Sequence, residues 1–255
     1  MLENIIDMLV SPSPMFFFVL VLLIFIFLDV INPLLSDIAI FTYFAWVYTN
    51  IEGSSNLATF YLIGMLFVIV LRVANRSFSL QGHSEINTRK ILGLSLAGKL
   101  PVVGVGAGIV ILIIMRMLQG VSTASIIGVP SLAISSDITN LVSISLLGIV
   151  ETRLFFSLYN LVKVNIAMFS TLPVVGLLFA VFSPIMPILM ISVLFGVFHI
   201  SAYALSVSAI IFAVMVMVIW VLSYEILDSD LPANIAHYLW NGLVVLGKSL
   251  KIIGG

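Results

Sequence analysis

The sequence predicts an all-α protein, a polytopic bundle of transmembrane helices. Of its 255 residues, 62% are hydrophobic and only 8% are charged, whereas an ordinary soluble domain carries about 25% charged residues. So few charges cannot cover a water-exposed surface of this size, and the mean hydropathy of +1.30 is that of a chain surrounded largely by lipid. The third observation is a succession of apolar runs long enough to cross a bilayer as helices, about 20 residues each.

Eight of these runs have the length of a spanning helix, for which the usable range is roughly 17 to 25 residues. In chain order they cover 15–33, 57–75, 100–120, 138–162, 166–183, 186–204, 206–227 and 232–250. The segment 33–49 is either a short span or an interfacial helix, because Asp37 lies at its start. We therefore expect eight or nine spans.

Charged residues orient the predicted bundle. Cytoplasmic loops of membrane proteins are enriched in Lys and Arg, and the longest polar stretch, 75–99, holds Arg76, Arg89, Lys90 and Lys99. With this basic loop in the cytoplasm, nine spans place the N-terminus outside and the C-terminus inside, and eight spans move the N-terminus inside. The first residues, "MLENIIDML", lack the basic start of a secretory signal, so we expect the first run to be retained as a span. The expected location is the plasma or cell membrane, which the chain crosses several times.

Composition also removes several classes of function. The formal net charge of −1 gives no indication of nucleic-acid binding. The chain has no cysteine, which excludes disulfides, a thiolate nucleophile and a Cys-ligated metal. Any chemistry must therefore come from the other polar side chains within or beside the spans.

Polar residues interrupt three of the predicted spans. Glu151 lies in "GIVETRLFFSLYN", His199 in "VLFGVFHISAY", and His237 and Asn241 in "LPANIAHYLWNGLVV". A charge at the membrane centre costs at least about 2.5–3.5 kcal/mol, so ionisable residues in spans indicate function by default. Each group alone could equally form a hydrogen bond to a neighbouring helix. Together, four groups that prefer water are better explained by one shared wet cavity.

These side chains fit hydrolysis of a peptide bond, which needs an activated water and donors for the oxyanion. Glu151 is the predicted general base, and His199 is expected to hold the same water. His237 and Asn241 share a helix face, where their N–H groups can form an oxyanion hole. By the predicted boundaries, His237 lies near the start of its helix whereas Glu151 and His199 lie about halfway along theirs. Convergence therefore requires helix tilt or a shifted boundary.

The order of these residues resembles the pattern of a known family. "ETRLFF", "FGVFH" and "HYLWN" are similar to the three motifs of the CAAX prenyl endopeptidase and bacteriocin-processing (CPBP) family of intramembrane glutamate proteases. The family pattern reads Glu-Glu-x-x-x-Arg, then Phe-x-x-x-His, then His-x-x-x-Asn or Asp. Phe195 with His199 and His237 with Asn241 match the last two motifs in full. The likeness covers roughly residues 138–250.

The resemblance implies an architecture, an activity and partners. Residues 137–255 correspond to the catalytic helical core, and residues 1–136 form N-terminal spans that are similar to the family only in being apolar. The implied activity is a CAAX-like intramembrane glutamate endopeptidase that uses no metal or other cofactor. Its implied substrate is a peptide or a membrane-associated protein, lipidated in the eukaryotic branch, where it is a prenylated CAAX protein. Prokaryotic relatives are linked to peptide maturation, bacteriocin immunity and scaffolding. The expected partners are this substrate and the lipid bilayer, and not nucleic acid.

The first motif departs from the family pattern. Glu151 matches the catalytic Glu, but Thr152 stands in place of the second Glu and Phe156 in place of the Arg. In the family these two residues are thought to support the catalytic carboxylate, and the loss of both leaves no uncompensated buried charge. We interpret Thr152, Phe195 and Arg153 as supporting residues in this chain. Arg153 follows Glu151 by two residues and lies on the far side of the helix, so we expect it to pair with another helix or to reach the cytoplasmic edge.

Three other interpretations stay open. In a metalloprotease variant, Glu151, His199 and His237 supply a His₂Glu ligand set of the kind that zinc hydrolases use. The departure in the first motif favours a catalytically impaired membrane scaffold or bacteriocin-immunity-type protein, which keeps the fold and binds peptides. A transporter predicts inverted repeats and helices broken near the midplane, and neither is evident in the sequence.

Overall fold

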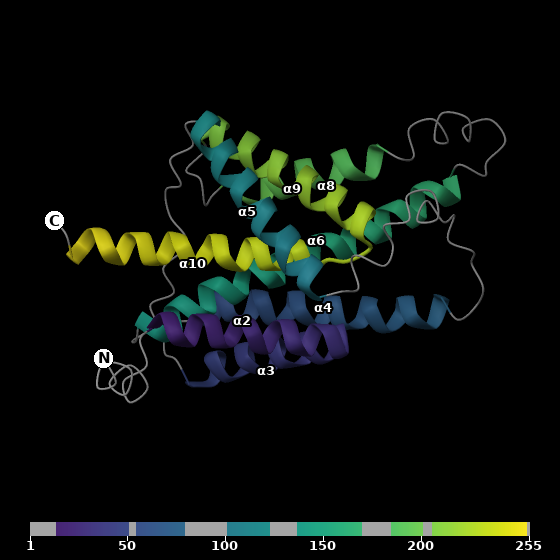
Figure 1. Ribbon diagram of the computed structural model, residues 1–255. Coiled ribbons are helices and arrows are strands. Elements are labelled where there is room, and N and C mark those ends of the chain that lie inside the picture. The colour runs from purple at the N-terminus through teal and green to yellow at the C-terminus, as the bar shows by residue number, and fades with distance from the viewer. Residues whose placement is uncertain are drawn as a thin grey trace.

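The computed structural model describes residues 14–50, 55–79, 101–122, 137–169, 185–200 and 206–253, and within them every regular element is a helix. In chain order the helices are α2 (Pro14–Ile31), α3 (Pro33–Asn50), α4 (Ser55–Ser79), α5 (Pro101–Ser122), α6 (Asp137–Phe169), α8 (Met186–Phe198), α9 (Val207–Leu227) and α10 (Leu231–Ile253) (Figure 1). The predicted all-α helical bundle is confirmed.

The surface of this bundle suits lipid. Four of the described helical segments are long and apolar enough to cross a membrane, namely Pro14–Ile31, Val102–Gln119, Ile138–Ile166 and Val207–Leu227. Large apolar side chains also face outward on several helices, among them Phe27 on α2, Ile63 on α4 and Met117 on α5, each more than half exposed. Contiguous exposed apolar surface is unfavourable in water and ordinary in a bilayer, so the fold supports the predicted membrane protein.

The helix boundaries differ from the predicted spans in two ways. The segment 33–49, which is ambiguous in the sequence, is covered by the helix α3. α6 is 33 residues long and continues past residue 162, because no Gly or Pro interrupts the chain there and the fall in hydropathy does not end the helix. Of the predicted span 166–183, the first four residues belong to α6 and the rest lies outside the described residues, as does most of the basic loop 75–99.

Contacts between side chains show how α3 and α6 run relative to each other. Tyr43 of α3 forms a hydrogen bond with Ser143 of α6 at 2.7 Å. Asp37 lies earlier in α3 and contacts Arg153, which lies later in α6. The two helices are therefore antiparallel.

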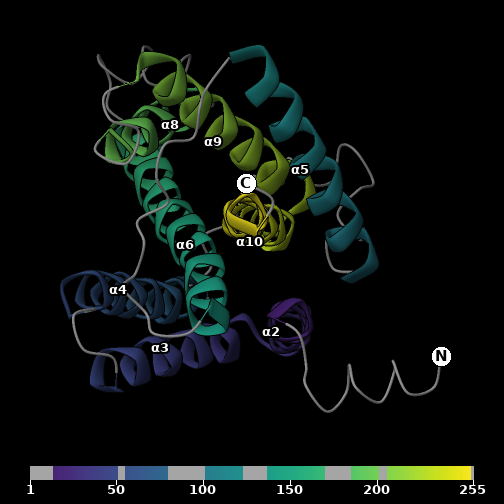
Figure 2. The same ribbon diagram turned by 90° about the vertical axis from the view of Figure 1, so that its left-hand side faces the viewer.

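α6 is the central helix of the bundle. Figure 2 shows it running between the group formed by α2, α3 and α4 and the group formed by α5, α8 and α9, with α10 beside it. All ten residues from Leu141 to Val150 are buried, so neighbouring helices enclose this part of α6 on every side. Glu151 follows this stretch directly and is therefore held inside the bundle.

α2 and α3 form a helical hairpin with its corner at Asn32. The side-chain oxygen of Asn32 accepts a hydrogen bond from the backbone N–H of Leu34 at 3.1 Å, which caps the start of α3. Pro33 takes the first position of α3, where its fixed φ favours a helix. The tight corner brings Asp29 and Asp37 together, 6% and 0% exposed. Two buried carboxylates at one corner need a cation nearby, and α6 supplies it.

α10 approaches α5 closely through two glycines. A Cβ atom at Gly104 would lie 2.8 Å from Cδ2 of Leu231, and one at Gly108 would lie 3.0 Å from Cβ of Ile235. Small residues four positions apart let two membrane helices pack backbone against backbone. This contact seats the first two turns of α10, which carry His237.

Candidate active site

Glu151 of α6 is the point on which three other side chains converge. Nε2 of His199 lies 3.5 Å and Nε2 of His237 lies 3.7 Å from Oε2 of Glu151. The hydroxyl of Tyr61, on α4, donates a hydrogen bond to Oε1 of Glu151 at 3.2 Å. The Glu151 side chain is only 12% exposed, so its carboxylate is largely shielded and each oxygen faces a polar group.

His199 reaches this position because α8 ends immediately before it. The helix ends at Phe198, and His199 is its C-cap residue. The prediction that His199 lies about halfway along a helix is therefore wrong, since the apolar residues around 199 conceal the helix end in a hydropathy pattern. Nδ1 of His199 donates a hydrogen bond to the backbone oxygen of Phe195 at 2.8 Å, because a carbonyl can only accept. This bond leaves Nε2 facing Glu151.

His237 lies in the second turn of α10 and is held by Thr152. The Thr152 hydroxyl donates to the backbone oxygen of Gly148 at 2.7 Å. Its oxygen therefore accepts the hydrogen bond from Nδ1 of His237 at 3.0 Å, and Nε2 of His237 faces Glu151. His237 contacts Glu151 although it lies near the start of α10, so the two groups are not separated by the predicted mismatch in depth.

The fixed tautomers determine what the site can bind. A neutral imidazole has one N–H and one acceptor nitrogen, and in both His199 and His237 the N–H is Nδ1. Both Nε2 atoms and Oε2 of Glu151 are thus acceptors that point toward one another. Their separations of 3.5 and 3.7 Å exceed a direct hydrogen bond of about 2.7–3.2 Å, and a water beside the three atoms, rather than directly between two of them, could donate to two of these acceptors. One water donates to two acceptors, so one water and one extra proton satisfy all three.

Asn241 lies one turn after His237 on the same face of α10. Its Nδ2 donates one hydrogen bond to the backbone oxygen of Ile144 at 3.1 Å, and the second N–H of the carboxamide remains for another acceptor. Both side chains pack on Gly148, where a Cβ atom would lie 2.9 Å from Nδ2 of Asn241 and 2.9 Å from Cγ of His237. Glycine at this position lets α10 approach α6 one turn before Glu151.

Aromatic rings enclose the two imidazoles. The ring centroid of Phe195 lies 4.3 Å from that of His199, and the ring centroid of Trp220 lies 4.6 Å from that of His237. Phe195 and Trp220 are 3% and 1% exposed and pack against each other. Phe195, predicted as a supporting residue, thus contacts His199 twice, through its carbonyl and through its ring.

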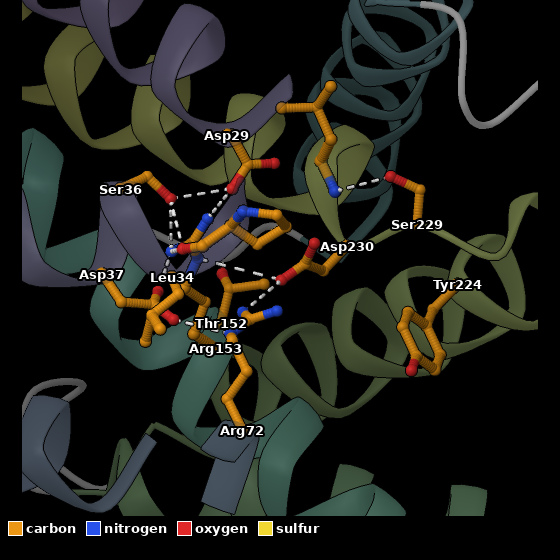
Figure 3. Close-up of polar contacts among 12 residues, drawn as sticks. Asp29, Leu34, Ser36, Asp37, Arg72, Thr152, Arg153, Tyr224, Ser229 and Asp230 are labelled. Carbon is orange, nitrogen blue, oxygen red and sulfur yellow. Dashed lines mark hydrogen bonds and ion pairs between the residues drawn. The ribbon is translucent and has the colours of Figure 1, made fainter. Parts of the chain in front are cut away.

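Arg153, also predicted as a supporting residue, does not lie against the Glu151 carboxylate. Its guanidinium donates to Asp29 and Asp37 at the α2–α3 corner (Figure 3). The side chain is 1% exposed, so of the two expected outcomes the structure shows pairing with other helices rather than extension to the cytoplasmic edge. Any support that Arg153 gives Glu151 must pass through α6.

Tyr61 is the site residue that sequence reasoning missed. It lies in the N-terminal part of the chain, where no motif marks it. Its one signal is a hydroxyl within the predicted span 57–75. Tyrosine is common at the ends of membrane helices as an interface anchor, so its presence there does not separate an anchor from a group that faces a carboxylate.

Glu151, His199 and His237, the predicted zinc ligands of the metalloprotease variant, are the same three groups that meet in the site. Among the described residues, no group of three or more His, Cys, Asp or Glu side chains is arranged to hold a metal ion. The use of a metal is therefore a question for a chelator experiment.

Comparisons with protein-family models, with curated proteins and with solved structures found no match to this chain. The family resemblance rests on the three sequence motifs alone. The functional argument consequently depends on the chemistry of the side chains that meet at Glu151.

Proposed function

We propose that this chain is an intramembrane endopeptidase that hydrolyses peptide bonds near the membrane with a water activated by Glu151 and His199. The observation that carries the proposal is the convergence of the Glu151 carboxylate with the imidazoles of His199 and His237, which three helices bring together. Such groups are costly inside a bilayer unless they bind something polar. A water and a peptide bond supply the donors and the acceptor that these groups require.

In the proposed mechanism, one water donates its hydrogens to Oε2 of Glu151 and Nε2 of His199. Glu151 takes a proton from this water as the water oxygen bonds to the carbonyl carbon of the substrate. The carbonyl oxygen gains negative charge, which is stabilised by His237, carrying the extra proton on Nε2, and by the second N–H of Asn241. Each such donor contributes about 10²–10³ in rate. The proton on Glu151 then passes to the leaving amine as the C–N bond breaks.

Membership of the CPBP family, with a changed first motif, is part of this proposal. Thr152 and Tyr61 take over the support that the family's second Glu and Arg give. Thr152 fixes the proton on Nδ1 of His237, and Tyr61 occupies Oε1 of Glu151 and so leaves Oε2 for the water. Phe156, in the place of the family's Arg, stacks instead on a tyrosine of α9.

The proposed substrate is a peptide or a membrane-associated protein, with lipidated proteins among the candidates, and the proposed location is the cell membrane with loop 75–99 in the cytoplasm. In this orientation the charged cluster beside Arg153 lies toward the cytoplasmic side. Arg72, on α4 shortly before the basic loop, contacts Asp37 at the α2–α3 corner and Asp230 in the turn before α10. The α2–α3 corner and the turn before α10 thus both lie near the C-terminal half of α4, beside Arg153.

The test is cleavage of a quenched-fluorescent peptide library by the purified full chain in nanodiscs. Glu151→Gln and His199→Gln remove the base and the second acceptor while keeping similar shapes. We expect both to lower turnover by about 10²–10⁴, the contribution of a general base. Glu225→Gln is the matched control, because this carboxylate pairs with Lys163 at an exposed position and its loss leaves cleavage unchanged.

The outcomes separate the proposal from its alternatives. Equal cleavage by the wild type and the two site variants, all correctly folded, excludes the mechanism. Inhibition by a chelator that zinc reverses replaces the metal-free mechanism with the metalloprotease. A wild type that binds library peptides without cleaving them, with binding unchanged by Glu151→Gln, indicates the scaffold.

A further inference from the structure

A second group of buried charges surrounds Arg153, two residues from Glu151 (Figure 3). The Arg153 cluster comprises Asp29, Ser36, Asp37, Arg72, Arg153 and Asp230. We propose that the Arg153 cluster is a positioning device, which fixes the rotation and height of α6 against α4 and α10 and thereby holds the Glu151 carboxylate against its partners. The inference rests on the proposed function in giving Glu151 the role of the base.

Apart from the hydrogen bond of Ser36 to Asp29 within the α2–α3 corner, the contacts of the cluster join α6 or α4 to another element. Arg153 donates to Ser36 at 2.9 Å and to the two aspartates of the α2–α3 corner. Its Nε lies 3.8 Å from Oδ2 of Asp230, in the turn before α10. Arg72 donates from Nε to Oδ2 of Asp37 at 2.6 Å and lies 3.5 Å from Asp230. Four helices and one turn therefore meet at a single point.

Three of the elements that meet at the Arg153 cluster also carry or precede site residues. α4 carries both Arg72 and Tyr61. α6 carries both Arg153 and Glu151. Asp230 immediately precedes α10, the helix that carries His237. A shift of any of these helices at the cluster must therefore also shift a group that touches the Glu151 carboxylate or one of its partners.

Directional contacts add to packing in fixing the rotation of α6. The ten residues from Leu141 to Val150 are all buried, so the helix has no polar face that must turn toward water. The hydrogen bonds of Arg153 supply such a direction. Arg153 and Glu151 are two residues apart, about 200° around the helix axis. Anchoring Arg153 on one side of α6 consequently sets the direction of Glu151 on the other side.

Stability alone does not account for this cluster. A buried ion pair must be desolvated, and an apolar pair of similar volume is often at least as stable. Arg153 and Asp37 are 1% and 0% exposed, and within the described residues Nε of Arg153 lacks a hydrogen-bond partner. Apolar side chains make no directional hydrogen bonds and so cannot fix one orientation of a helix. Buried polar groups provide such conformational specificity in some proteins.

The test replaces one charge of each sign, so that no new uncompensated charge is created. The double variant Arg153→Met/Asp29→Leu removes one ion pair of the cluster and leaves Arg72 with its aspartates. The matched control is Lys163→Met/Glu225→Leu, which removes an ion pair between α6 and α9 away from the site. Both variants are made in the full chain and checked for folding by size exclusion and thermal unfolding.

A disulfide reporter measures the position of α6 without any substrate. The chain has no native cysteine, and a Cβ at Gly64 of α4 would lie 3.9 Å from Cγ1 of Val150, so Gly64→Cys/Val150→Cys is a clean pair. We expect oxidation to cross-link this pair in the wild-type background and in the control, and about tenfold more slowly in Arg153→Met/Asp29→Leu. With a cleaved library peptide, we expect kcat of that variant to fall about 10²-fold with KM little changed, the loss typical of a misplaced catalytic group.

Unchanged cross-linking and unchanged kcat in the folded double variant overturn the proposal and leave the cluster a purely structural role. If the double variant fails to fold, the cross-linking rate and kcat are measured in Arg153→Lys, which keeps the charge and loses the planar fork. Slower cross-linking with a lower kcat supports the positioning role, and no change in either overturns it. If the wild type cleaves no peptide, the proposed function fails. The cross-linking rates then still decide whether the cluster positions α6.

Discussion

The contact of α10 with Gly148 yields the sharpest prediction, because one added methyl group presses directly on the site. In Gly148→Ala the new Cβ would lie 2.9 Å from Nδ2 of Asn241 and from Cδ2 of His237. Ordinary contacts begin near 3.4 Å, so α10 must move by about 0.5 Å, the difference between the two distances. Such overpacking costs about 1–3 kcal/mol, against a helix-propensity gain of at most about 1 kcal/mol.

The matched control is Gly64→Ala, on the neighbouring interface of α4 with α6. There the added Cβ finds its nearest atoms at 3.8 and 3.9 Å, which is ordinary contact, so the propensity gain is kept. We expect Gly148→Ala to be about 1–3 kcal/mol less stable than Gly64→Ala, because the propensity gain is common to both, measured by reversible unfolding in mixed micelles. We also expect peptide turnover to be at least about tenfold lower in Gly148→Ala and to be unchanged in Gly64→Ala. Equal stability and equal turnover of the two variants would refute the packing of His237 and Asn241 on α6.

Two further predictions concern hydroxyl groups that hold the site. Thr152→Val keeps the shape but leaves Nδ1 of His237 without its acceptor, which should destabilise the protein by about 1–3 kcal/mol in the same unfolding assay. The control Thr152→Ser keeps the hydroxyl and should retain most of the stability. A Thr152→Val variant as stable as the wild type would contradict the tautomer assigned to His237. Tyr61→Phe removes the donor to Oε1 of Glu151, and we expect kcat to fall about 10- to 100-fold, since a hydrogen bond to a charged group contributes about 1.5–3 kcal/mol. Wild-type kcat in Tyr61→Phe would mean that the phenol only fills space.

The sequence allowed the fold class and the core of the site to be predicted for identifiable reasons. The scarcity of charge and the length of the apolar runs are properties of composition, and they indicate a helical membrane bundle whatever the packing. Glu151, His199 and His237 stand out because polar groups are rare in spans. The relation of His237 to Asn241 follows from the helical repeat alone.

What the sequence did not reveal depends on contacts between distant segments. Asp37 looked like the mark of a span boundary, yet it is buried at a hairpin corner and pairs with Arg153, 116 positions away. The end of α8 before His199 escaped notice because apolar residues continue through the turn. Tyr61 carried no motif, and only the packing of α4 against α6 identifies it as a partner of the carboxylate.

Nitrogen-15 NMR of histidine-labelled protein tests most directly whether Glu151, His199 and His237 share one space and one proton. The chain has three histidines, and His199→Gln and His237→Gln assign the signals. We predict that Nδ1 is protonated in both site imidazoles and that one of the two Nε2 atoms carries an additional proton at neutral pH. We also predict that this proton is lost in Glu151→Gln. An Nε2–H tautomer with a bare Nδ1 in either ring, or a spectrum indifferent to Glu151→Gln, would contradict the account.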